Sequence, residues 1–122
     1  MLGILRESYL ENVTIFKHRS CLSKLRCSAH TLRIEKGRHV NELMADRVCT
    51  LCQLDDIYVL EDEYHFLLCC PYYYTLRETY LSDWIEPTYE LFIALLMNDN
   101  VETQRNLAAY VYHAVKLRNE LL

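Results

Sequence analysis

Residues 49–71 have the sequence CTLCQLDDIYVLEDEYHFLLCCP, and this stretch decides the fold because it concentrates thiol and imidazole side chains. Cys49 and Cys52 form a Cys-x2-Cys turn, which places two sulfur atoms on one side of a tight knuckle. His65 follows on a predicted helix and can approach the same point from the far side. Thiolate and imidazole are the ligands that zinc prefers in tetrahedral sites. We therefore predict one structural zinc ion in this stretch.

Two adjacent residues compete for the fourth ligand position, and helix geometry alone leaves the assignment open. Cys69 lies four residues after His65, on nearly the same helix face, whereas Cys70 is one residue beyond that face. Pro71 disfavours α geometry at Cys70, so the helix should end there, where the backbone can turn a side chain inward. We favour Cys70 as the ligand and expect Cys69 to be a small buried apolar residue.

The six cysteines of the chain also admit a disulfide or redox role, or ordinary burial. A thioredoxin-type motif needs a βαβ context, and the sequence offers none. The N-terminal apolar stretch meets Arg6 and Glu7 too soon for a signal-peptide core, so we expect an intracellular protein of the nucleus or cytoplasm. Thiols stay reduced there, which favours metal binding over disulfides.

The composition predicts a mainly α fold, a small helical domain with a zinc knuckle. The 122 residues include only two glycines and two prolines, too few for the many tight turns of a β-sandwich or barrel. Apolar spacing and capping residues predict helices over 4–11, 15–32, 62–70, 71–80, 88–97 and 101–121. We expect a single domain, 1–122, with a basic helical part (1–46), a zinc-binding module (47–82) and C-terminal helices (83–122).

Charge is unevenly divided along the chain. Residues 1–50 hold nine Lys or Arg against five Asp or Glu, whereas residues 51–122 hold four against twelve. A phosphate-binding surface is therefore expected in the first half, with a solvated helix face as the alternative interpretation. Three arginines recur every seven residues on the predicted 15–32 helix and just beyond it, with other cations nearby. The candidate nucleic-acid-binding set is Arg19, Lys24, Arg26, Arg33, Lys36 and Arg38.

The finger and its flanks resemble the zinc-binding region at the C-terminal end of non-LTR retrotransposon reverse transcriptases. The resemblance lies in Cys49-x2-Cys52, EDEYHFLL at 61–68, Cys70-Pro71 and Arg77, and in the preceding segments LSKLRCSAH (22–30) and IEKGR (34–38). It covers about residues 20 to 80. It implies the tail of a retroelement polyprotein or a host gene descended from one, with binding of RNA or DNA. By position it also implies the ligands Cys49, Cys52, His65 and Cys70, the last directly before proline.

We expect no enzyme activity, because the sequence contains no paired-aspartate polymerase motif and no acidic set spaced as in an endonuclease or RNase H. Four protein ligands would also close the zinc site to substrate. No apolar run approaches the length of a membrane span, and no small-molecule substrate is indicated. The alternative function is a zinc-stabilised protein-interaction module, without nucleic acid binding, in which the helices of residues 88–121 dock on a partner.

Overall fold

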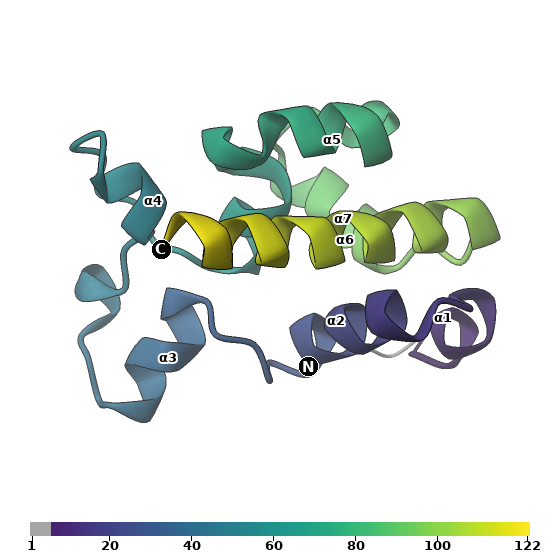
Figure 1. Ribbon diagram of the computed structural model, residues 1–122, viewed down its shortest axis with the longest axis horizontal. Helices are drawn as coiled ribbons and strands as arrows, with labels where there is room; N and C mark the ends of the chain where they lie inside the picture. The colour runs from purple at the N-terminus through teal and green to yellow at the C-terminus, as the bar shows by residue number, and fades with distance from the viewer. Residues whose placement is uncertain (1–5) are drawn as a thin grey trace.

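The computed structural model describes residues 6–122, and within them the fold is mainly helical, as predicted. One long helix, α7 (Val101–Leu121), runs through the middle of the molecule (Figure 1). Helices α1 (Arg6–Asn12) and α2 (Phe16–Arg26) pack along one side of it, and α5 (Tyr74–Tyr80) packs along the other. The shorter α6 (Tyr89–Leu96) lies behind α7 in this view.

Helix α7 forms where its capping and apolar residues predict. The Asn100 side chain accepts a hydrogen bond from the Thr103 amide at 3.0 Å, which satisfies one of the free N–H groups of the first turn. Tyr110 and Val111 are buried in the middle of the helix. Ala108 and Ala114 are fully buried, and their small side chains let α2 and α5 come close. The prediction of a helix over residues 101–121 is confirmed.

The other predicted elements of the second half are also present. The Thr88 side chain caps α6 by accepting from the Leu91 amide at 3.1 Å. Pro71 opens a short 3-10 turn, Pro71–Tyr73, which continues directly into α5. In the described residues no β-strand occurs, and a single antiparallel bridge joins Val48 to Leu60.

The predicted helix over residues 15–32 is wrong, because α2 ends at Arg26. Ser28 adopts a left-handed conformation with a φ of 56°. The Ala29 amide then donates to the Lys24 carbonyl at 2.8 Å, and the Ser28 amide donates to the Leu25 carbonyl at 3.4 Å. These two bonds form a Schellman motif, which usually has glycine at the left-handed position. A serine there gave no stop signal in the sequence.

A separate helix, α3 (Arg33–His39), follows this break. Gly37 lies inside α3 and is buried. A Cβ atom at Gly37 would lie 2.5 Å from the Cγ of Arg47, so the glycine allows the Arg47 side chain to cross the helix closely. Arg47 then donates to the carbonyls of Glu42 and Ile34, which fixes the loop after α3.

A buried ion pair joins the middle of the chain to α7. Arg118 donates from Nε and Nη2 to the two Glu61 carboxylate oxygens, at 2.9 and 2.8 Å. Glu61 is 1% exposed and Arg118 is 7% exposed. The Glu61 carboxylate also accepts the Arg33 amide at 2.8 Å, at the start of α3. Glu61 therefore connects α3, the 47–61 loop and α7, a role different from the helix cap that its sequence position suggested.

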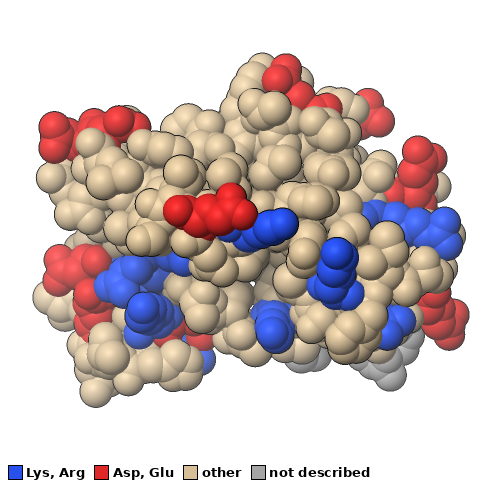
Figure 2. Space-filling view, viewed as in Figure 1, with Lys and Arg blue, Asp and Glu red and all other residues tan. Residues whose placement is uncertain are grey.

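The charged side chains are unevenly distributed on the face drawn in Figure 2, where Asp and Glu also lie beside the cations over α3 and α7. Lys and Arg lie mainly over α2, α3 and the adjoining edge of α7, whereas the part of this face over α4 (Thr50–Gln53) and α5 shows Asp and Glu without Lys or Arg. The exposed cations of the described residues are Lys17, Lys24, Lys36, Arg38, Arg105 and Lys116.

We predict that Arg118→Ala destabilises the protein by about 3–5 kcal/mol, because it leaves the Glu61 carboxylate buried without its partner. Urea unfolding followed by circular dichroism measures this loss. Lys116→Ala, an exposed substitution on the same helix, should change the free energy of unfolding by less than about 0.5 kcal/mol. In a double-mutant cycle, Glu61→Ala and Arg118→Ala together should cost less than the sum of the single changes. Strictly additive costs would show that the pair contributes nothing.

Candidate metal centre

The first two candidate ligands lie in a loop whose ends are held together by the backbone. The Cys49 amide donates to the Val59 carbonyl at 2.7 Å, and the Glu61 amide donates to the Arg47 carbonyl at 2.9 Å, on either side of the Val48–Leu60 bridge. One helical turn, α4, begins directly after Cys49 and contains Cys52. The two sulfur atoms are thus placed on one side of the turn, as the Cys-x2-Cys spacing predicts.

The other two candidate ligands lie at the two ends of an unusual helical turn. Asp62 begins it by accepting from the His65 amide at 2.8 Å. Residues His65–Cys69 form a π-helical turn, and the Cys70 amide donates to the His65 carbonyl at 2.8 Å. A π turn takes in one residue more than an α turn. It therefore brings Cys70, and not Cys69, onto the side of the helix that carries His65.

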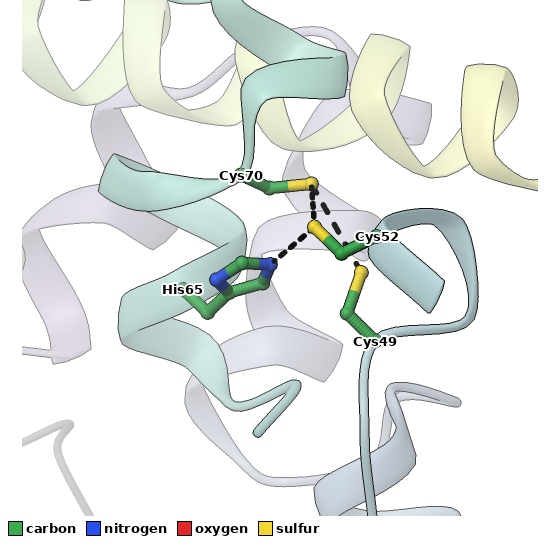
Figure 3. Close-up of side chains that lie close together, drawn as sticks. All are labelled: Cys49, Cys52, His65 and Cys70. Atoms are coloured by element: carbon green, nitrogen blue, oxygen red, sulfur yellow. Dashed lines mark hydrogen bonds between the residues drawn. The ribbon is translucent and has the colours of Figure 1, made fainter. Parts of the chain in front are cut away.

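Cys49, Cys52, His65 and Cys70 converge on one point, with their ligand atoms all within 4.8 Å of one another (Figure 3). The Cys70 sulfur lies 4.0 Å from that of Cys49 and 3.8 Å from that of Cys52. His65 Nε2 lies 3.5 Å from the Cys52 sulfur. A tetrahedral site with metal–ligand bonds near 2.3 Å to sulfur and 2.0–2.1 Å to nitrogen has edges of about 3.8 Å and 3.6 Å. These three separations fit such a site. The group as a whole extends up to 4.8 Å, which is longer than these edges.

All four side chains are buried, and their burial and mutual contacts shift the pKa values of the three thiols. Cys49 and Cys70 are fully buried, Cys52 is 1% exposed and His65 is 8% exposed. The hydrogen bond from the Cys70 thiol lowers the pKa of Cys49, and the same contact together with burial raises the pKa of Cys70. Burial and the neighbouring Cys49 raise the pKa of Cys52. Three thiolates this close together would repel one another, and a bound cation would offset that repulsion.

Arg77 positions the backbone of the cluster without touching its sulfur atoms. This residue is 4% exposed, and its Nη2 donates to the Cys70 carbonyl at 2.6 Å. Its Nη1 donates to the Tyr110 hydroxyl at 3.4 Å, and that hydroxyl donates to the Phe66 carbonyl at 2.6 Å. Arg77 thus ties the end of the π turn to α7. Arg77 belonged to the family resemblance, but nothing in its sequence position alone indicated this contact.

Cys69 lies outside the cluster. It is partly buried and packs against the edge of the hydrophobic core, and burial raises the pKa of its thiol. The prediction that Cys69 would be a small packing residue agrees with this position. Among the described residues, the four-membered group is the one set of His, Cys, Asp and Glu side chains close enough to hold a metal ion.

The prediction that Arg19, Arg26 and Arg33 form one exposed stripe is wrong. Arg26 is 5% exposed, and its Nη1 donates to the Leu96 carbonyl at 2.7 Å, at the end of α6. Arg33 belongs to α3 and pairs with Glu42. The helix break after Arg26 separates the two and changes the register on which the stripe depended.

The rest of the candidate nucleic-acid set differs in exposure. Arg19 is partly buried and donates to the Val13 carbonyl at 3.4 Å. Arg38 is exposed and pairs with Glu35 at 2.6 Å. Lys24 and Lys36 are exposed, and within the described part of the chain neither takes part in an ion pair.

Comparison with protein-family models, with curated proteins and with solved structures found no match to this chain. None of the helices in the described part of the chain is long and apolar enough to span a bilayer. The geometry of the four-residue group therefore carries the functional argument.

We predict that Cys70→Ser removes metal binding, whereas Cys69→Ser retains it. The two substitutions change the same chemical group at neighbouring positions, so each controls for the other. Elemental analysis of the purified variants measures the metal bound per chain. A metal-free Cys69→Ser variant with a loaded Cys70→Ser variant would show that the π turn does not select the ligand.

Proposed function

We propose that the protein is a zinc-stabilised helical module that binds single-stranded RNA or DNA. The binding surface is the basic face, which we define by the exposed lysines of α2 and α3. The observation that carries the zinc assignment is the convergence of three buried thiols and one buried imidazole within 4.8 Å of one another. Three of their separations are close to tetrahedral edges. Zinc is borderline soft and favours this ligand set, whereas calcium and magnesium favour oxygen ligands. When bound, zinc would supply the positive charge that three neighbouring thiolates require.

A structural role follows from the number of ligands. Catalytic zinc sites keep one position for water or substrate, whereas structural sites have four protein ligands. The four side chains here come from two segments, Cys49–Cys52 and His65–Cys70, which are separated by twelve residues, of which 53–58 are exposed. A shared metal would hold these segments together and would contribute directly to the free energy of folding.

We predict one zinc ion per chain, and we predict that a strong chelator unfolds residues 47–75 while part of α7 persists. Helix α7 also packs against α1, α2 and α5, and these contacts do not depend on the metal ligands, although Tyr110 of α7 meets the π turn at Phe66. Elemental analysis measures the stoichiometry, and hydrogen exchange with and without chelator locates the loss of structure. Protein that contains no zinc, or exchange rates that chelator leaves unchanged, would contradict the prediction.

The nucleic acid assignment is supported by the Lys and Arg side chains over α2, α3 and the edge of α7 in Figure 2, and by rings beside one of the cations. The Lys17 ammonium lies 5.0 Å from the centre of the Tyr112 ring. The His18 ring lies 5.0 Å from Tyr112 and 5.8 Å from His113. Partly exposed rings next to cations are the combination that binds bases and phosphates of single strands. The resemblance to the retroelement finger supports the same class of partner.

The phosphate contacts that we propose differ from those expected from the sequence. Arg26 is buried, and Arg33 and Arg38 are paired with carboxylates, so these three are poor phosphate ligands. The exposed lysines of α2 and α3, Lys17, Lys24 and Lys36, take their place. Such contacts position a strand without reading its bases, so little sequence preference is expected.

We predict that binding to a fluorescent single strand weakens with salt, with a log–log slope of about −0.7 for each phosphate contacted. Lys17→Ala/Lys24→Ala should flatten that slope by about 1.4, since two contacts are lost. Fluorescence anisotropy at several salt concentrations measures both slopes. The measurement includes an oligoribonucleotide and an oligodeoxyribonucleotide of the same sequence.

A matched control separates local contacts from net charge. Thr75→Glu/Thr79→Glu also lowers the net charge by two, but on exposed positions of α5, away from the basic face. This variant should leave the slope unchanged. Equal weakening by both double variants would show that only the overall charge matters. No binding at low salt would exclude the nucleic acid role and leave the zinc assignment standing.

A further inference from the structure

Helix α6 has an apolar surface that the described fold leaves in solvent. Its sequence, YELFIALL, contains one charged residue, Glu90. The inner side is buried, as Phe92, Leu95 and Leu96 are each no more than 3% exposed. The outer side carries Tyr89, Ile93 and Met97, which are 62%, 37% and 37% exposed. We call these three residues the α6 outer face.

An exposed outer face is unusual for such a sequence, because helices that are apolar on all sides are normally buried on all sides. Helix α6 also lies outside the set of helices that pack closely on α7 within the described residues. Besides the core packing of its inner side, specific contacts hold both of its ends. The Tyr64 ring lies 5.5 Å from Tyr89 and 5.6 Å from Phe92, and the Arg26 guanidinium binds the Leu96 carbonyl.

The charges around this helix identify the partner it suits. Residues 82–104 contain five acidic residues and no Lys or Arg. The five are Asp83, Glu86, Glu90, Asp99 and Glu102. An apolar stripe on an acidic segment of the chain is complementary to a helix with one apolar side and a basic border.

We propose that the α6 outer face binds an amphipathic helix of a partner protein whose apolar side is flanked by Lys or Arg. A second copy of this chain is a poorer occupant. A symmetric dimer through α6 would bring the same acidic segments of both copies together, and like charges across an interface are repulsive. The proposal is independent of nucleic acid binding, since Tyr89, Ile93 and Met97 are not among the residues proposed to contact phosphate.

The test uses two synthetic model helices of equal length, one built from Leu and Lys and one with Glu in place of Lys. Isothermal titration of the zinc-loaded protein should show saturable one-to-one binding of the Lys peptide and at least tenfold weaker binding of the Glu peptide. Ile93→Ser/Met97→Ser should weaken binding of the Lys peptide at least tenfold. Leu43→Ser/Met44→Ser is the matched control, since those apolar residues are 73% and 56% exposed elsewhere. This control should bind within twofold of the original protein.

The serine substitutions could unfold α6, and circular dichroism would detect that loss of helix. A second variant that leaves the apolar residues unchanged keeps the test valid in that case. Glu86→Gln/Glu90→Gln removes two exposed charges without altering the apolar face, and it should weaken the Lys peptide at least threefold. Equal binding of both peptides, or equal effects of the two serine variants, would overturn the proposal. A dimer seen by light scattering that Ile93→Ser/Met97→Ser dissociates would also overturn it, because the occupant would then be a second copy.

Discussion

Cys49, Cys52, His65 and Cys70 are buried and share one small volume, and the backbone on both sides is arranged to allow this. The Val48–Leu60 bridge closes the loop that carries Cys49 and Cys52. The π turn then brings Cys70 to the side of His65. Both arrangements are short. A metal ion that joined the four ligand atoms, as we propose, would link the two segments and add to their stability.

Two buried arginines connect this local arrangement to the rest of the molecule. Arg77 binds the carbonyl of a candidate ligand, and Arg118 binds Glu61 at the end of the knuckle. Both reach α7, the first through the Tyr110 hydroxyl and the second because it belongs to that helix. Buried charges are costly unless they are paired and hydrogen-bonded. The position of α7 is thus coupled to the geometry of the cluster, although its apolar packing lies against other helices.

The sequence predicted those features that depend on local signals. The Cys-x2-Cys spacing, the proline after Cys70 and the Asn100 cap each act within a few residues, and the cluster and α7 formed as expected. The long-range pairs could not be predicted. Glu61 had the sequence context of a helix cap, and its partner Arg118 lies 57 residues away. The basic stripe failed for a related reason, because a serine in a left-handed conformation ended α2 without the glycine that normally marks such a stop.

In this fold the basic first half and the acidic second half of the chain contribute different helices to the surface. Because α2 and α3 come from the basic first half, most Lys and Arg side chains of the face drawn in Figure 2 lie over these two helices and the adjoining edge of α7. Helix α6 comes from the acidic half and exposes apolar residues instead. Arg26 links the two elements, since it belongs to α2 and its buried guanidinium donates to the Leu96 carbonyl of α6. One arginine of the basic segment thus holds α6 in place, and Arg33 and Arg38 pair with carboxylates, so the exposed cations of that segment without an ion pair are lysines.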